Sequence, residues 1–325
     1  MATVRAGYGA PVSPDQFPDP DATGLDAGLD RAVELLSGRR TTVLTGAGIS
    51  TDSGIPDYRG PGSTPRTPMT FDEFTGSAAM RSHYWARNQY GWRHLARARP
   101  NPGHTALARL EEAGAVTGVV TQNIDRLHQA AGSLNVVDLH GRYTRVGCMR
   151  CATLIPRAVL SDLFDELNPG FYDAISSPDD IEFAPDADAL VPRTAGFRVP
   201  DCPVCGGVLK PDVVFFGENA PRHRVLRALR MVDAADALLV VGSSLTVNSG
   251  RRFVRHAVRA GAPVVIVNHG RTRGDASARL KIDASASDFL AGLERRLGRP
   301  QDTGGCAEDH IGPDRGAFRP LLGDG

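Results

Sequence analysis

Neither sign of charge is in excess in this chain of 325 residues, because 37 lysine and arginine residues balance 37 aspartate and glutamate residues. A balanced chain creates no global field that would recruit nucleic acid or an anionic membrane surface. Lysine is nearly missing, since it occurs only as Lys210 and Lys281, and codon bias toward arginine is the simplest reason. No apolar run approaches the roughly 18 residues of a membrane span, and residues 1–20 lack the apolar core of a signal peptide. We expect a cytoplasmic protein with no nucleic-acid or membrane partner.

Cysteine is also scarce, and its five positions do not suggest a disulfide framework. Four of them form two Cys-x-x-Cys pairs, Cys148 with Cys151 and Cys202 with Cys205. Four thiolates suit a closed tetrahedral Zn²⁺ site, which is structural because it keeps no open position for a substrate. A redox dithiol is the alternative, but two pairs that bracket one segment argue against it. Cys306 remains as an unpaired bystander.

Both ends of the chain are rich in Pro, Gly and Asp, a composition that buries too little apolar surface to order itself. We predict disordered tails over residues 1–20 and 299–325. The 41% hydrophobic and 23% charged content is typical of a globular protein. Residues 21–298 should therefore form the folded part.

Short, continuously apolar runs alternate with helical segments inside the folded part. The strand-like runs are Thr41–Thr45, Val116–Thr121, Ala237–Val241 and 263–267, and the helical stretches are 25–36, 104–113, 222–231 and 251–260. Runs that are apolar on both faces suit buried parallel strands. The alternation predicts an α/β fold with a doubly wound, Rossmann-like parallel sheet, whose ligands bind beyond the carboxyl ends of the strands.

Two segments interrupt this alternation and predict an inserted small part. We expect a large part of residues 21–55, 101–144 and 211–298, and a small part made of a helical and loop module over 56–100 and a zinc-binding module over 145–210.

The first predicted strand runs directly into Gly46-Ala-Gly48. Glycines there let the backbone approach a pyrophosphate, and a following helix would direct its N–H groups at the anion. The pattern lacks the third glycine of the usual dinucleotide fingerprint, and a tight strand-to-helix turn is the alternative. Asp57 and Arg59 follow in a segment too rich in Gly and Pro for a regular helix, and they favour a nucleotide site.

The other predicted strands also end in small or amide-bearing residues. These ends are Gln122-Asn-Ile-Asp125, Gly242-Ser-Ser244 and Asn268-His-Gly270. Such residues often only form turns. Four such ends at one edge of a doubly wound sheet nevertheless favour a nucleotide ligand.

His140 lies between a short apolar run and Gly141. A histidine there can act as a general base near neutral pH, although a packed or solvent-facing ring is the alternative. His104 and His128 we interpret as structural residues on helix faces. The run from Leu209 to Glu218 resembles an exposed strand that pairs with an extended peptide, with a buried sheet strand as the alternative.

These motifs, in this order along the chain, resemble those of the sirtuins. The resemblance covers about residues 21–298, and Asp57-Tyr-Arg59, Tyr84-Trp-Ala-Arg-Asn88 and Gln122-Asn-Ile-Asp125 look most like the class II group. That group includes many bacterial members and the mitochondrial lipoamidase-type enzyme.

The resemblance implies an NAD⁺-consuming protein-lysine deacylase with one structural Zn²⁺. His140 would be the general base and Asn123 a second catalytic residue. The products would be free lysine, nicotinamide and O-acyl-ADP-ribose. The implied NAD contacts are Gly46, Ala47, Gly48, Ile49, Ser50, Thr51, Asp57, Tyr58, Arg59, Gln122, Asn123, Ile124, Asp125, Gly242, Ser243, Ser244, Asn268, His269, Gly270 and Ala286.

Acylated-lysine proteins or peptides are the implied partners, and they would meet Val214, Phe215, Phe216 and Gly217. Sirtuins that prefer succinyl-like groups carry a Tyr-x-x-Arg pair, and Tyr84 and Arg87 have this spacing. Arg87 would then bind an acyl carboxylate; the alternative is an arginine on the outer face of a helix. Mono-ADP-ribosyl transfer, lipoamidase activity and a non-catalytic NAD-sensing module stay open as other functions.

Overall fold

The computed structural model describes residues 23–58, 67–172, 184–189, 191 and 194–297. Both predicted tails, Arg59 and Cys306 lie outside the described residues. Among the described residues, no helix combines the length and the apolar character needed to cross a membrane.

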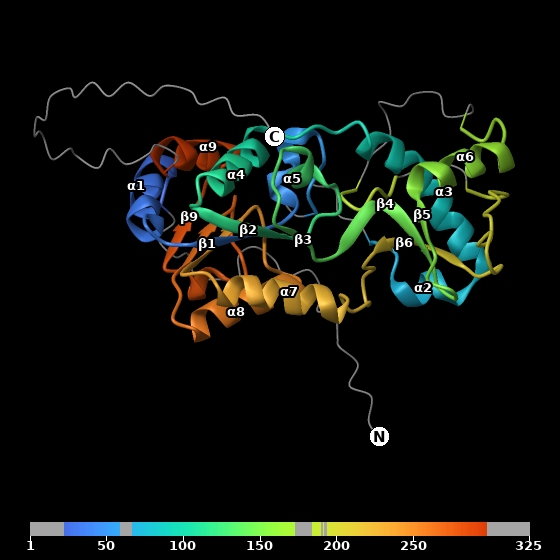
Figure 1. The fold of residues 1–325 in the computed structure, drawn as a ribbon. Coiled ribbons are helices and arrows are strands. Elements are labelled where there is room, and N and C mark those ends of the chain that lie inside the picture. The colour runs from blue at the N-terminus through green and yellow to red at the C-terminus, as the bar shows by residue number, and fades with distance from the viewer. Residues whose placement is uncertain (1–22, 59–66, 173–183, 190, 192–193, 298–325) are drawn as a thin grey trace, which may run out of the picture.

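A six-stranded parallel sheet forms the larger of two layered regions (Figure 1). Its spatial order is β3-β2-β1-β7-β8-β9, so the chain builds outward from β1 in one direction and then in the other. The strands are β1 (Thr41–Thr45), β2 (Val116–Thr121), β3 (Val136–Asp138), β7 (Ala237–Val241), β8 (Val264–Val267) and β9 (Leu280–Ile282). In such an order the crevice for a ligand opens between β1 and β7, at the carboxyl ends of the strands.

Helices cover both faces of this sheet, as Figure 1 shows. One face carries α1 (Leu25–Leu36), α4 (Pro102–Glu112) and α9 (Ala286–Leu297), and the other carries α7 (Arg222–Asp233) and α8 (Asn248–Arg259). Neighbouring strand residues alternate between the two layers: Val43 belongs to the first apolar cluster and Leu44 to the second. Because both clusters are buried, the strands are continuously apolar rather than alternating.

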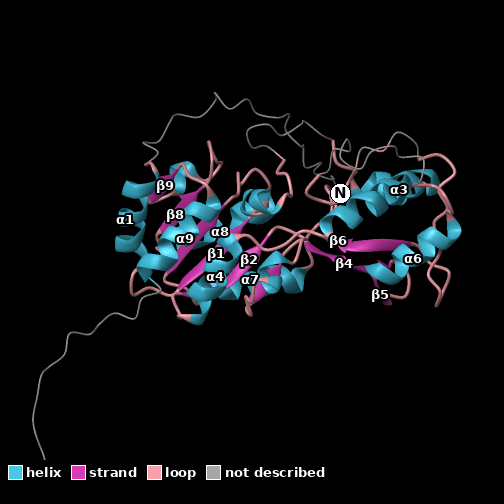
Figure 2. Ribbon diagram, turned by 90° about the horizontal axis from the view of Figure 1, so that it is seen from above, coloured by secondary structure: helices cyan, strands magenta, loops and turns pink. Residues whose placement is uncertain are grey.

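The second region is a three-stranded antiparallel sheet with its own helices, beside the first (Figures 1 and 2). Its order is β5 (Leu154–Pro156), β4 (Gly141–Cys148) and β6 (Leu209–Val213), and its helices are α2 (Phe71–Gly76), α3 (Ala78–Leu95) and α6 (Arg157–Leu167). The core here is rich in aromatic side chains, among them Phe74, Trp85 and Phe164, all with no exposed surface.

One short connection carries the chain from the first sheet into the second. β3 ends at Asp138 and β4 begins at Gly141, so Leu139 and His140 span the junction. Gly141 has φ of 93°, and a Cβ there would lie 1.9 Å from the Asp212 carbonyl oxygen. Only glycine fits this crossing.

The fold class predicted from the sequence is confirmed, and the bounds of β1, β2 and β7 match the prediction. The short apolar run before His140 is β3, whereas β9 was not predicted, because a three-residue strand shows no readable period. The helix expected after Gly46-Ala-Gly48 is wrong: two 3₁₀ turns follow, Ala47–Ile49 and Thr51–Ser53. The run from Leu209 to Glu218 is a strand only as far as Val213.

Candidate active site

The predicted nucleotide-binding loops meet at the carboxyl ends of the parallel strands. Gly48 donates its N–H to the Gly242 carbonyl at 2.9 Å, so the loops after β1 and β7 are in direct contact. A Cβ on Gly48 would lie 2.9 Å from the Gly242 Cα, and a Cβ on Gly46 would lie 2.7 Å from the Gly242 oxygen. Two backbones therefore pack here with no side chain between them, and the Gly46 and Gly48 N–H groups donate to the Val241 and Gly242 carbonyls.

Asn123 and Asp125, which follow β2, bind the loop that follows β1. The Asn123 amide donates to the Gly46 carbonyl and to Ser50 Oγ, both at 3.0 Å. Ser50 Oγ in turn donates to Asp125 at 2.7 Å. Asp125 is buried, and burial raises the pKa of its carboxyl group. These bonds fix the loop at the crevice and orient polar groups around it.

His140 lies at the junction of the two sheets, where backbone bonds hold it from both sides. Leu139 donates to the Thr121 carbonyl of β2 at 2.9 Å, and Val214, just after β6, donates to the His140 carbonyl at 2.8 Å. The ring is half-buried, with Nδ1 2.9 Å from the Gln122 carbonyl and Nε2 2.7 Å from Ser249 Oγ.

The electrostatic surroundings keep this ring neutral. Burial lowers the pKa of His140 to about 4, and the positive charges of Arg224 and Arg252 contribute to the shift. A neutral imidazole can accept a proton, so His140 has the protonation state that a general base requires at neutral pH.

The strand ends of β8 and β9 supply the far side of the crevice. Asn268 donates its N–H to the Ile282 carbonyl at 3.2 Å, and its own carbonyl accepts from the Lys281 ammonium group at 2.6 Å. The Gly270 N–H and the His269 ring contact the Asp283 carboxylate at 3.1 and 3.0 Å. Ala286 is buried at the start of α9.

Of the predicted nucleotide contacts among the described residues, those after β1, β2, β7 and β8 thus lie at one edge of the sheet. Ser243 accepts from the Gln122 amide at 2.8 Å, which joins the ends of β2 and β7. Tyr58 stands apart from this edge, because its ring packs edge-on against Phe216 with centroids 6.0 Å apart.

Residues 214–217 do not continue the β6 strand, and they bind the helical module instead. Phe71 donates to the Phe216 carbonyl at 2.9 Å. The Lys210 ammonium group pairs with Glu218 at 3.0 Å, and the Phe215 N–H donates to the same carboxylate at 3.0 Å. The segment next to His140 is therefore tied at both ends.

Tyr84 and Arg87 project from α3 toward different surroundings. Tyr84 is buried against Phe215, with ring centroids 5.1 Å apart. Arg87 pairs with Asp188 at 2.5 Å and donates to the Ala189 carbonyl at 3.0 Å. The guanidinium group thus lies neither free in a pocket nor on an outer helix face, and an acyl carboxylate would have to displace Asp188.

The four paired cysteines form one cluster in the antiparallel region. All four sulfur atoms lie within 4.8 Å of one another, and all four cysteines are free thiols. The Sγ atoms of Cys148 and Cys205 are 3.5 Å apart, and those of Cys151 and Cys202 are 3.8 Å apart. A tetrahedral Zn²⁺ with bonds of about 2.3 Å requires sulfur separations of about 3.8 Å. The cluster fits a closed, structural metal site.

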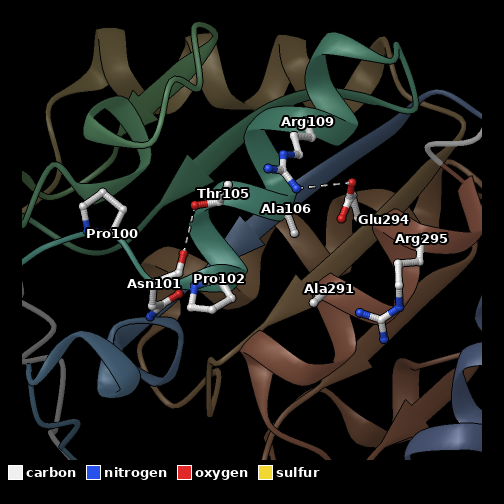
Figure 3. Close-up of a pocket in the computed structure, with 9 residues that line it drawn as sticks. All are labelled: Pro100, Asn101, Pro102, Thr105, Ala106, Arg109, Ala291, Glu294 and Arg295. Atoms are coloured by element: carbon white, nitrogen blue, oxygen red, sulfur yellow. Dashed lines mark hydrogen bonds and ion pairs between the residues drawn. The ribbon is translucent and has the colours of Figure 1, made fainter.

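A cavity of about 730 Å³ opens between α4 and α9, on the outer side of the crevice (Figure 3). Arg109 and Glu294 face each other across it, 3.7 Å apart. It contains none of the predicted site residues. Asn101 connects the cavity to the site, because its side chain donates to the Ile49 carbonyl at 2.7 Å.

Three residues around the site were not predicted from the sequence. Asp138 is buried and forms ion pairs with Arg126 and Arg142 at 2.6 and 2.9 Å. Its position two residues before His140 could have marked it in the sequence. Lys281 was recognisable as one of only two lysines. No pattern in the sequence marks Ser249 as a site residue, because only the fold brings it to His140.

A model of the Sir2 family matches residues 46–249 of this chain. NAD-dependent protein deacetylase 1 of Mycobacterium avium (strain 104) is 56% identical over 265 residues, which cover 82% of this chain and 94% of that protein. A solved structure of Sir2 with a p53 peptide and NAD⁺ is similar at a TM-score of 0.66 and 33% identity. A structure of Sir2 bound to an acetylated peptide is similar at a TM-score of 0.66 and 32% identity. Each of these alignments covers 83% of this chain and 98% of the solved one.

Proposed function

The chain belongs to the Sir2 family, and we propose that it is an NAD⁺-dependent protein-lysine deacetylase. The observation that carries the proposal is the His140 ring at the junction of the two sheets, linked through Gln122 to the close-packed glycine loops after β1 and β7. Relatives named as NAD-dependent protein deacetylases, and related structures with NAD⁺ and acetylated peptide, support it. They favour deacetylation over ADP-ribosyl transfer, lipoamidase activity or binding without turnover.

NAD⁺ supplies the bond from which nicotinamide leaves, and its ADP-ribose part takes the acyl group from lysine. The backbone of Gly46, Ala47 and Gly48 would hold the pyrophosphate. Asn123 and Asp125, already fixed to the loop after β1, would orient the ribose and the carboxamide. His140 would accept the proton of a ribose hydroxyl at Nε2, the atom that carries its lone pair.

The remaining NAD contacts are proposed on the same basis. Ile49, Ser50, Thr51, Asp57 and Tyr58 would flank the loop after β1, with Gln122 and Ile124 after β2. The adenosine end would meet Gly242, Ser243, Ser244, Asn268, His269, Gly270 and Ala286. The contact of Arg59 with NAD⁺ is proposed from the sequence alone.

The peptide would lie along Val214–Gly217, beside His140. The support is that this segment is bonded to the His140 carbonyl at one end and to α2 at the other. Tyr84 contacts it through Phe215 and would lie near the acyl group. Because Asp188 neutralises Arg87, we propose that neutral acyl groups are preferred to succinyl-like ones.

The proposed division of labour follows the two parts predicted from the sequence, and the bounds between them run through β4 and β6 of the antiparallel sheet. The large part, residues 21–55, 101–144 and 211–298, would bind NAD⁺. The small part, residues 56–100 and 145–210, would bear the structural metal ion and complete the cleft. The free thiols of the metal cluster fit the reducing cytoplasm, and the balanced charge supports neither nucleic-acid nor membrane binding.

A panel of acetyl-, succinyl-, hydroxymethylglutaryl- and lipoyl-lysine peptides, each with and without NAD⁺, tests this function. We expect nicotinamide and O-acetyl-ADP-ribose in equal amounts from the acetyl peptide. Protein-bound ADP-ribose without deacylation would overturn the proposal. Replacing His140 by Tyr separates catalysis from binding, because a binding-only protein would be indifferent to it.

A further inference from the structure

Both ring nitrogens of His140 have hydrogen-bond partners, and the partners define where its proton lies. The Gln122 carbonyl, 2.9 Å from Nδ1, can only accept, so Nδ1 carries the hydrogen. Nε2 then carries the lone pair and accepts a hydrogen bond from Ser249 Oγ at 2.7 Å. The atom that must receive a proton is therefore capped by the hydroxyl group of Ser249.

The fold fixes Ser249 and Gln122 against each other. Ser249 is the second residue of α8, and the next residue, Gly250, packs on the Gln122 side chain so closely that a Cβ there would lie 2.6 Å from Oε1. The Gln122 amide also donates to Ser243 at 2.8 Å. One glutamine thus joins the end of β2, the loop after β7 and the first turn of α8, and the two partners of the ring cannot move independently.

The charged groups around the ring favour its neutral form. Arg224 of α7 and Arg252 of α8 both oppose protonation of His140. The carboxylate of Asp212 on β6 pairs with Arg224 at 2.7 Å and with Arg145 of β4 at 2.6 Å. Because two arginines already pair with this carboxylate, it does not serve as the ion-pair partner of a protonated His140 ring.

We propose that Ser249 is a positioning residue for His140. With the Gln122 carbonyl on the opposite nitrogen, its hydroxyl fixes the tautomer and the plane of the ring and keeps the Nε2 lone pair hydrogen-bonded until a ribose hydroxyl replaces it. A single lone pair accepts one hydrogen bond, so the substrate hydroxyl takes the place of Ser249 Oγ. This role rests on the proposed function, in which His140 is the base.

The test compares Ser249→Ala with Ser249→Thr, which keeps the hydroxyl, and with Asn248→Ala, which alters the exposed neighbour in the same helical turn. Loss of this hydrogen bond of the free enzyme should lower kcat/KM for NAD⁺ about two- to tenfold. Since a hydroxyl that donates to Nε2 stabilises the neutral ring of the free enzyme, its removal should shift the acid limb of kcat/KM to higher pH. The Thr variant should regain the wild-type profile, and the Asn248 variant should match wild type.

Nuclear magnetic resonance titration of the His140 ring keeps the test independent of turnover. The pKa of His140 should rise in Ser249→Ala and not in Ser249→Thr. If the wild type lacks deacetylase activity but this shift is present, the proposed function fails and the hydrogen bond stands. An unchanged titration and an unchanged pH profile of kcat/KM in Ser249→Ala, or equal losses in the Ala and Thr variants, would overturn the role of Ser249.

Discussion

The parallel sheet and the antiparallel sheet are stabilised by different means. In the parallel sheet, every residue of β1, β7 and β8 is buried, and aliphatic side chains from helices cover both faces. In the antiparallel region, β4 mixes buried and partly exposed positions, and four thiols gather near its end. The first region is large enough to rely on apolar burial, whereas we expect the second to depend on a metal ion held by its four cysteines.

The small region also buries an arginine among aromatic rings, whereas Lys281, a buried cation of the large sheet, donates to backbone carbonyls. Arg157 is 1% exposed, lies over the Trp92 ring at 4.7 Å and donates to Gln89 at 2.7 Å. Burial lowers the pKa of Arg157 to about 9. The comparison predicts that the junction at His140 joins a region held by aliphatic burial to one whose stability depends more on polar and metal contacts.

Removal of the metal ion should produce the largest difference in stability between the two regions. In Cys202→Ala, or after chelation, the antiparallel region should lose its amide protection from hydrogen exchange while the parallel sheet keeps its own. Structural Zn²⁺ contributes on the order of 10 kcal/mol in small domains, so this is the largest effect expected. Cys306→Ala serves as the control with unchanged metal content. One zinc per chain and full protection in Cys202→Ala would contradict the metal assignment.

Replacement of the junction residue should abolish catalysis without unfolding either region. We expect His140→Asn to lower kcat about 10²- to 10⁴-fold, because a positioned general base contributes this much. The exposed His223 on α7 offers a matched control, and His223→Asn should keep wild-type kcat. Enzyme assays, metal analysis and thermal unfolding check these outcomes together. If the His140→Asn variant kept wild-type kcat, His140 would not be the general base.

Acidification should weaken the parallel sheet region through two buried histidines. The rings of His104 and His128 lie 4.9 Å apart, and His128 bonds to Thr45 of β1 at 2.9 Å. Burial lowers the pKa of His104 to about 4 and that of His128 well below its usual value.

The sign of this effect follows from which state binds protons. Between pH 6.5 and about 4 the unfolded chain protonates His104 and the folded chain does not, so stability is full above pH 6.5 and falls as the pH drops. His104 alone should account for roughly 3 kcal/mol. Urea unfolding of wild type and His104→Gln from pH 8 to 5 measures this. Equal pH slopes in the two proteins would contradict it.

The smallest expected effect concerns acyl selectivity in the small region. Asp188→Asn should free Arg87 and raise kcat/KM for a succinyl peptide relative to an acetyl peptide by about tenfold, since a charged hydrogen bond contributes this order of energy. The exposed Asp162 of the same region gives the control variant Asp162→Asn. An unchanged ratio would show that Asp188 does not restrict the acyl group.

The same contrast explains which parts of the fold were predictable. β1, β2 and β7 are continuous apolar runs, so their bounds could be read to the residue. The predicted start of α4 was two residues late because the capping role of Asn101, which accepts from Gly103 and His104 at 3.0 and 3.2 Å, went unrecognised. β4 could not be predicted, because its exposure follows no period of two.

Within the site, residues that directly follow a strand could be predicted from the sequence, whereas pairings that depend on packing could not. Glycine, asparagine and histidine after apolar runs mark the edge of a parallel sheet by position alone. The pairing of Arg87 with Asp188 joins residues 101 positions apart, and that of His140 with Ser249 joins residues 109 apart. No local pattern encodes such pairs.

The sequence by itself determined the parallel sheet, the loops at its edge and the four cysteines of the metal cluster, and it predicted His140 as the base. Each of these depends on the type of a residue and its immediate neighbours. Only the tertiary structure decided that His140 is neutral and capped by Ser249, that Arg87 is already paired, and that the cysteine pairs meet within 4.8 Å. Burial and charge at a site are sums over segments distant in the chain, and packing alone brings those segments together.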